Sequence, residues 1–250
     1  MPGKTRHSPK NCLVFAHRGA NTEAMENTRN AFDKALGYAI DGIETDIQLS
    51  RDEIAVLWHD RFLDRIGLSD KHIDDFDYHQ LKALINPESE SEGIMTLQDF
   101  LAAYRKRCRL LLEIKNRDWE PVSRHELKIR QTLDLVGQNL DQRIIVSSFN
   151  LPSLVYARQY NPALPLVYNF ETAQTIADAR KLLNTHAFLH GLCLPIASVD
   201  QAIVGLLREQ QKCIAVYTCN SDSEINKALQ LGVDILISDL PHKALILRDQ

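Results

Sequence analysis

Three carboxylate side chains lie in strand-like stretches that are otherwise mostly apolar. Glu44 and Asp46 share one face of GIETDIQL, because strand side chains alternate, and Glu113 lies in RLLLEIK. Three carboxylates that face inward repel one another and resist desolvation unless a positive group lies between them. One such carboxylate alone is more often a structural ion pair, so the inference depends on the set. The set predicts a divalent metal site, and all-oxygen ligation favours Mg²⁺ or Ca²⁺ over zinc.

Two histidines end apolar runs beside these clusters. His17 lies in AHRGA and His59 in LWHD. An imidazole titrates near neutral pH, so two of them at one site suit a general acid and a general base. A lone histidine in such a place is more often structural, and the assignment therefore depends on the pair together with the carboxylates.

Two cations complete the group of polar residues. Arg18 follows His17, and Lys115 lies two residues after Glu113, on the same face of its strand. Arginine binds phosphate oxygens in a bidentate manner, and lysine binds them as a point charge. The whole set predicts a site for a phosphate ester. There a metal would polarise the phosphoryl oxygens, while one imidazole takes a proton from the attacking oxygen and the other donates one to the leaving oxygen.

Short apolar runs typical of strands alternate with amphipathic stretches typical of helices along the chain. Helix starts are recognisable at Thr28 and at Thr96, which has Asp99 three residues later in a capping-box spacing. The alternation predicts an α/β fold, a closed (β/α)8 TIM barrel, in which functional groups from the carboxyl ends of the strands meet at one mouth. The predicted strands are 13–16, 42–49, 54–59, 109–115, 143–149, 164–169, 188–194, 213–218 and 234–238.

The second and third predicted strands cannot both belong to a parallel barrel. Only residues 50–53, SRDE, separate them, whereas a parallel crossover needs about a dozen residues, so we predict an antiparallel hairpin with one added arm. A turn centred on Arg51 and Asp52 would set Glu44 roughly across from His59. Asp52 is followed by glutamate and not by glycine, so a turn other than type I′ is expected.

Residues 60–95 differ in composition from the rest of the chain. They are rich in Asp, Glu and Ser and contain one helical run, DYHQLKALI. We predict a small insertion after the third strand that covers one end of the barrel. No internal repeat or low-complexity tract is visible, so residues 1–250 are expected to form a single catalytic TIM-barrel domain.

Composition excludes several classes of partner and site. A net charge of −4 and a pI of about 6.1 do not provide the basic surface that nucleic-acid binding requires. Residues 1–11 lack the apolar core of a secretory signal, and no apolar run approaches the roughly 18 residues of a membrane span, so we expect a cytoplasmic protein without stable membrane association. Five cysteines without CxxC spacing indicate buried free thiols. A homodimer is compatible with the sequence.

Taken in order, the clusters resemble the glycerophosphodiester phosphodiesterases, a family of metal-dependent (β/α)8-barrel hydrolases. The resemblance extends from about Val14 to Pro241, nearly the whole chain. The HRG motif alone is weak evidence for this family, whereas the ordered set of motifs is highly specific for it. The matching motifs are HRG, ENT, E-T-D, HD, EIK, SSF, VYTCN and ISDLP.

The resemblance implies hydrolysis of deacylated phospholipids, such as glycerophosphocholine or glycerophosphoethanolamine, to sn-glycerol 3-phosphate and an alcohol. It implies that the two histidines are the acid/base pair, that the three carboxylates bind the metal and that the two cations contact phosphate. Tyr217 replaces a tryptophan common in the family, which leaves the shape of the substrate pocket open. The residues implied to support the site are Glu26, Asn27, Phe149 and Tyr217.

Two other functions remain open from the sequence. A lysophospholipase D-like enzyme of the same fold would need an apolar groove or a membrane-facing loop at the mouth. Residues 60–95 are too polar to suggest one, although Phe62 and Phe76 are candidates for exposed apolar residues there. A barrel that only binds a phosphorylated metabolite should have lost a histidine or a carboxylate, and this sequence has kept the full set.

Overall fold

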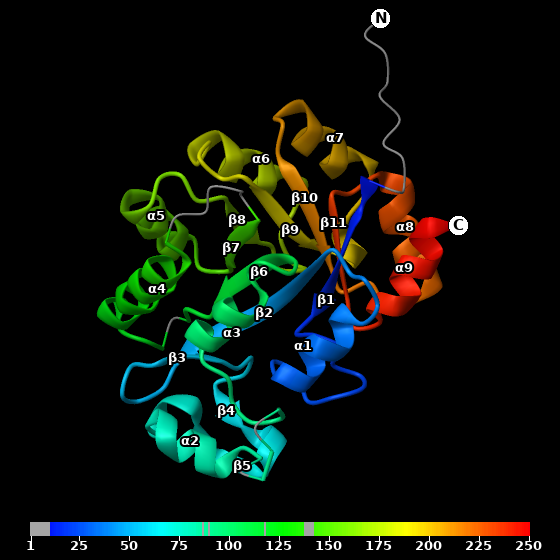
Figure 1. The fold of residues 1–250 in the computed structure, drawn as a ribbon. Coiled ribbons are helices and arrows are strands. Elements are labelled where there is room, and N and C mark those ends of the chain that lie inside the picture. Colours follow the sequence, from blue (N-terminus) through cyan, green and yellow to red (C-terminus); the bar gives the residue numbers. More distant parts are fainter. Residues whose placement is uncertain (1–10, 87, 90, 118, 138–142) are drawn as a thin grey trace, which may run out of the picture.

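The computed structural model describes residues 11–250 apart from residues 87, 90, 118 and 138–142. Eight parallel strands form a closed barrel, because β1 pairs with both β2 and β11 (Figure 1). The predicted (β/α)8 architecture is confirmed. Around the ring the strands are β1 (Leu13–His17), β2 (Gly42–Leu49), β6 (Arg109–Ile114), β7 (Ile144–Ser148), β8 (Leu166–Asn169), β9 (Gly191–Pro195), β10 (Cys213–Tyr217) and β11 (Ile235–Ser238).

Helices surround the barrel, and buried apolar residues between helices and strands form the main core. The predicted helix starts are confirmed, since the side chain of Thr28 accepts a hydrogen bond from the backbone N–H of Ala31, and that of Thr96 from Asp99. The outer helices are α1 (Arg29–Leu36), α3 (Leu97–Tyr104), α4 (Val122–Val136), α5 (Leu151–Tyr160), α6 (Ile176–Thr185), α7 (Gln201–Glu209), α8 (Asp222–Leu231) and α9 (Pro241–Asp249).

The strands fill the barrel interior with alternate residues. Eight apolar side chains, among them Phe15, Leu111 and Val167, pack together there. Polar side chains take the next inward positions toward the carboxyl ends, so that Glu113 lies two residues after Leu111 and Asn169 two residues after Val167. One end of the interior is therefore a packed core, and the other is available for chemistry.

The predicted antiparallel hairpin is confirmed, but the predicted register was wrong by one residue. Leu57 of β3 (Ala55–Leu57) lies opposite Ile47, so continuing the ladder would set residue 60, not His59, across from Glu44. The cause is a turn of three residues, 51–53, between the paired residues 50 and 54. Glu53, at a φ of 64°, is the third residue of this turn, a common alternative to the two-residue type I′ turn.

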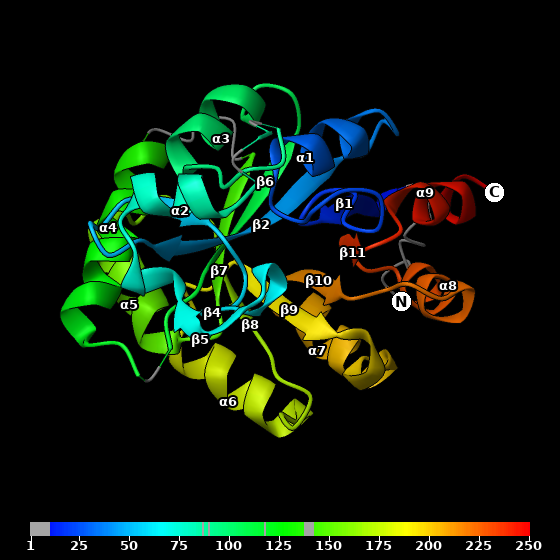
Figure 2. The same cartoon turned by 90° about the horizontal axis from the view of Figure 1, so that it is seen from below.

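The described residues between β3 and α3 form a small unit with its own apolar core, which includes Trp58, Leu63 and Leu81. The predicted helix is present as α2 (Tyr78–Leu84). An antiparallel pair, β4 (Phe62–Leu63) and β5 (Leu68–His72), was not predicted, because LSDKH has no apolar alternation. Figure 2 shows these cyan elements in front of the barrel strands, at the end toward which β2 runs.

The sequence predicted free cysteines and no membrane-spanning segment. All five cysteines are free, four of them buried and Cys213 half-buried, in agreement with the absence of paired spacing. Within the described ranges, no helix combines the length and apolar character needed to traverse a bilayer. The expectation that no secretory signal is present concerns mainly residues 1–10, which lie outside the described residues.

Candidate active site

The three carboxylates meet at the carboxyl ends of the neighbouring strands β2 and β6. Asp46 lies directly beside Glu113 in the parallel register, and one oxygen each of Glu44, Asp46 and Glu113 lies within 4.8 Å of the others. None of the three residues is more than 9% exposed. Burial and repulsion by Asp46 raise the pKa of Glu44 well above its ordinary value. Such a cluster requires compensating positive charge.

The donor atoms of this cluster fit a divalent cation. Oε2 of Glu44 is buried, and it has no hydrogen-bond partner within the described part of the chain, so it has a free acceptor position at the cluster. All three donors are hard carboxylate oxygens, which Mg²⁺ and Ca²⁺ prefer. The residues that would hold the ion are Glu44, Asp46 and Glu113.

Two cations lie against the carboxylates. Nζ of Lys115 is 2.9 Å from Oδ1 of Asp46 and 2.5 Å from Oε1 of Glu113, and Nε of Arg18 is 3.0 Å from Oδ2 of Asp46. Burial alone would raise the pKa of Asp46, but Lys115 and Arg18 lower it well below its usual range, so Asp46 remains ionised. Both cations are thereby fixed beside the candidate metal site, where a phosphate group would bind.

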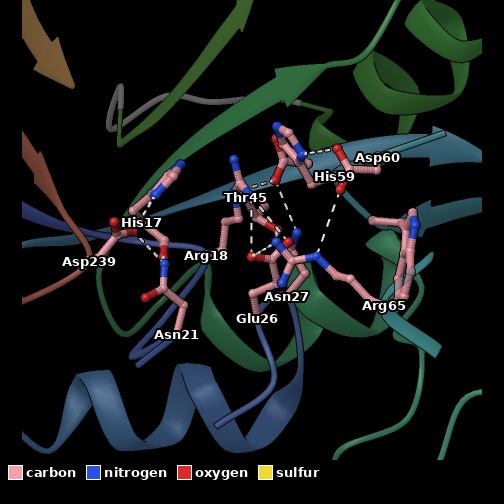
Figure 3. A network of polar contacts seen from close by, with 12 residues as sticks. His17, Arg18, Asn21, Glu26, Asn27, Thr45, His59, Asp60, Arg65 and Asp239 are labelled. Carbon is pink, nitrogen blue, oxygen red and sulfur yellow. Dashed lines mark hydrogen bonds and ion pairs between the residues drawn. The ribbon is translucent and has the colours of Figure 1, made fainter. Parts of the chain in front are cut away.

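The loop between β1 and α1 places Glu26 and Asn27 next to Arg18 (Figure 3). Nη1 of Arg18 donates to both carboxylate oxygens of Glu26, at 3.1 and 3.2 Å. Nδ2 of Asn27 donates to Oδ2 of Asp46 at 3.0 Å, while its Oδ1 accepts from the hydroxyl of Thr45 at 2.7 Å. Glu26 therefore holds Arg18, and Asn27 holds Asp46.

His17 ends β1 with its ring between two carboxylates. Its Nδ1 is 2.6 Å from Oδ1 of Asp239 (Figure 3). Its Nε2 is 3.8 Å from Oε2 of Glu44. The side chains of Asn21 and Asn220 donate to the two oxygens of Asp239 at 2.5 and 2.6 Å. Burial raises the pKa of Asp239, but the hydrogen bonds from His17 and Asn21 lower it further than burial raises it. The ionised Asp239 fixes the proton on Nδ1, which leaves Nε2 toward the carboxylate cluster.

His59 reaches the site through a bend in the chain, because β3 ends two residues before it. The buried side chain of Gln48 holds this bend, since its Nε2 donates to the carbonyl oxygens of residues 58, 59 and 60 at 3.3, 3.0 and 2.6 Å. Nδ1 of His59 is 2.7 Å from Oδ1 of Asp60. Burial lowers the pKa of His59 to about 4; Asp46 opposes this shift, and Lys115 adds to it.

Phe149 and Tyr217 form an aromatic wall at the site. Their rings meet edge to face with centroids 6.1 Å apart, and Nζ of Lys115 lies 6.0 Å from the Phe149 centroid. The guanidinium of Arg117 lies 5.3 Å from the same centroid. The hydroxyl of Tyr217 donates to the carbonyl of Phe170 at 2.5 Å, which fixes the orientation of its ring.

Most of the predicted site residues line one cavity. It encloses about 630 Å³ of empty space, its open mouth included, at the carboxyl ends of the barrel strands. Eight of the predicted residues line it, from His17 on β1 around to Tyr217 on β10. The other three, Glu26, Asn27 and Asp46, lie behind this lining. Glu26 contacts Arg18, Asp46 contacts Arg18 and Lys115, and Asn27 contacts Asp46.

Sequence reasoning missed several residues that hold the site, among them Asp239, Asn220 and Gln48. Asp239 directly follows β11, so the strand-end rule that identified His17 could have found it. Asn220 lies three residues beyond β10 and falls under the same rule. Gln48 carries no comparable signal, because glutamine is mostly an exposed residue type and its burial here depends on the bend that it holds.

Comparison with known proteins relates these features to one family. A sequence model of the glycerophosphoryl diester phosphodiesterase family matches residues 17–243. A glycerophosphodiester phosphodiesterase of Bacillus altitudinis is 30% identical over 250 residues, which cover 95% of this chain and 98% of that protein. One from Bacillus subtilis (strain 168) is 26% identical, with 94% of this chain and 85% of that protein covered.

Solved structures show the same barrel. A phosphodiesterase of Oleispira antarctica, in complex with the product sn-glycerol-3-phosphate, has a TM-score of 0.82 and 27% identity, with coverage of 95% of this chain and 97% of that chain. A glycerophosphodiester phosphodiesterase of Thermotoga maritima shares the fold, with a TM-score of 0.79, 23% identity, and coverage of 94% and 98%. This chain is therefore a phosphodiesterase, and it belongs to the glycerophosphoryl diester phosphodiesterase family.

Proposed function

We propose that this enzyme hydrolyses glycerophosphodiesters, such as glycerophosphocholine and glycerophosphoethanolamine, to sn-glycerol 3-phosphate and an alcohol. The observation that carries the proposal is that one cavity holds His17, His59 and Lys115 beside the carboxylate cluster. The sn-glycerol-3-phosphate in the Oleispira antarctica structure supports the product class.

The proposal includes a divalent cation, Mg²⁺ or Ca²⁺, held by Glu44, Asp46 and Glu113. When bound, such an ion polarises the phosphoryl oxygens and offsets their negative charge. Arg18 and Lys115 bind the remaining charge of the phosphate, and both are already held in place by their contacts with Asp46.

His59 is the proton acceptor in this proposal. Since its pKa is about 4, the ring is uncharged at neutral pH, and the contact between Nδ1 and Asp60 leaves Nε2 available for the proton of the attacking oxygen. His17 is the remaining imidazole in the cavity, and it donates a proton from Nε2 to the leaving oxygen. Asp239 keeps Nδ1 protonated throughout, so His17 does not change tautomer between turnovers.

The direct test measures sn-glycerol 3-phosphate released from glycerophosphocholine, with Mg²⁺, with Ca²⁺ and with excess EDTA. We expect release with a divalent ion and none with EDTA. Glu113→Gln, which removes one charge from the carboxylate cluster, should be inactive, whereas Glu209→Gln, at an exposed glutamate on α7, should match the wild type.

Alternative activities would be recognised by other measurements on the same protein. Release of choline from lysophosphatidylcholine, without turnover of glycerophosphocholine, would replace the proposal with a lysophospholipase D-like function. A persistent cyclic phosphate signal in phosphorus NMR would contradict simple hydrolysis. Binding of sn-glycerol 3-phosphate without turnover of either substrate would indicate a binding protein.

A further inference from the structure

The inner wall of β7 and β8 carries polar groups that the proposed chemistry does not use. Ser147 and Asn169 lie on these neighbouring strands, and both line the same cavity as His17. In the ring of eight strands β8 is the fourth from β1, so Asn169 lies across the barrel interior from His17. The two residues therefore border the part of the cavity that lies opposite the proton donor.

Asn169 is buried, and its hydrogen-bonding capacity is largely unfilled. The residue is 3% exposed, and its Nδ2 lies 3.4 Å from Oγ of Ser147, near the long limit for a hydrogen bond. Its Oδ1 is buried and has no hydrogen-bond partner among the residues that the structure describes. Most buried amides are paired, because an unpaired one loses its hydration without compensation. An amide with free hydrogen-bonding positions in the wall of a ligand cavity indicates a ligand group that forms hydrogen bonds with it.

The surroundings limit what that ligand group can be. Leu111, Cys193 and Ile237 line the same cavity, and burial raises the pKa of the Cys193 thiol, so it stays uncharged. The hydroxyl of Tyr217 is already bound to Phe170. A hydroxyl group on a short carbon chain suits this part of the cavity. The chain can contact the apolar side chains, and the hydroxyl can donate to Oδ1 of Asn169 and accept from its Nδ2. A trimethylammonium group has no N–H or O–H to donate.

We infer that Asn169, supported by Ser147, determines specificity by binding a hydroxyl of the glycerol moiety of the substrate. The inference rests on the proposed function, and it places the glycerol end of glycerophosphocholine, not the choline end, inside the barrel. An analogue without hydroxyls leaves the amide unpaired and binds more weakly. Buried polar groups discriminate strongly in this way, because the wrong ligand leaves them without a partner.

The test compares binding of sn-glycerol 3-phosphate with binding of propyl phosphate, which has the same carbon chain and phosphate but no hydroxyl. Isothermal titration calorimetry of the Mg²⁺-loaded protein should show a preference for sn-glycerol 3-phosphate of at least about tenfold. Asn169→Leu, an apolar side chain of similar size, should lose most of this preference. Asn184→Leu, a matched change at an exposed residue on α6, should keep it.

Results with the wild type and with the variant could each overturn the inference. One is equal binding of the two ligands, or no binding of either, by the wild type, a result that does not depend on whether Asn169→Leu folds. The other is a folded Asn169→Leu protein that keeps the full preference. Failure of the proposed function is a separate outcome, in which the wild type prefers sn-glycerol 3-phosphate but releases none from glycerophosphocholine.

Discussion

Oδ1 of Asp239 lies 2.6 Å from Nδ1 of His17, although the two residues are 222 positions apart in the chain. They are neighbours because β11 pairs with β1 and closes the barrel. The hydrogen bond that fixes the tautomer of His17 therefore forms only when the first and last strands meet. Asn21 and Asn220 hold the same carboxylate from the loops after β1 and β10.

Asp239→Asn should lower kcat by at least about a hundredfold, the usual scale of an acid/base contribution. An amide can donate to Nδ1, which would favour the tautomer with the proton on Nε2 and remove the fixed Nδ1–H. Steady-state kinetics with glycerophosphocholine would measure the loss. Asp222→Asn, at an exposed aspartate paired with Lys243, is the matched control and should keep wild-type activity. Full activity of Asp239→Asn would show that the contact does not position His17 for catalysis.

His17→Ala and His59→Ala should each lower kcat by at least about a hundredfold, because each removes one proton-transfer group. The exposed His79 on α2 provides the control, and His79→Ala should not change kcat. Kinetics should be accompanied by Mg²⁺ titration, since a histidine that merely supported the metal would alter affinity instead of turnover. Near wild-type turnover of either variant would rule out its assigned role.

His59 should titrate far below the usual range of histidine in the metal-free protein. Burial lowers its pKa to about 4 from 6.5, so an NMR titration of its ring protons should have a midpoint near 4. Between these two pH values the unfolded chain binds a proton that the folded protein does not, so the free energy of unfolding should fall as the pH decreases through this window. His59→Gln should reduce this dependence. A midpoint near 6.5 would show that burial does not control the pKa of His59.

Glu44→Gln should stabilise the metal-free protein and weaken its binding of divalent cations. Burial and Asp46 raise the pKa of Glu44, so the folded wild type becomes less stable as the pH rises through that pKa, and a neutral glutamine avoids this loss. Removing a charged ligand should lower Mg²⁺ or Ca²⁺ affinity at least about tenfold.

Thermal unfolding with EDTA or with added metal would test both parts of this prediction. The wild type should gain more stability from the metal than Glu44→Gln does. Glu209→Gln changes an exposed glutamate on α7 and should respond as the wild type does. Equal stabilisation of all three proteins by metal would show that Glu44 is not a ligand.

The sequence by itself determined the barrel and the residue types of the site. Strand and helix periods are local properties, and side-chain alternation decides which strand residues face inward. Because a parallel barrel brings all its carboxyl ends to one mouth, His17, Glu44 and Lys115 could be placed together without any knowledge of their distances.

Only the tertiary structure decided how these groups are held. The extra residue in the turn at 51–53 shifted the hairpin, so His59 depends on the bend that Gln48 holds instead of on strand pairing. The contact between Asp239 and His17 required closure of the ring, and the unfilled amide of Asn169 is evident only once its neighbours are known. Periodicity specifies the direction in which a side chain points, whereas hydrogen-bond partners depend on the packing of segments that are distant in the chain.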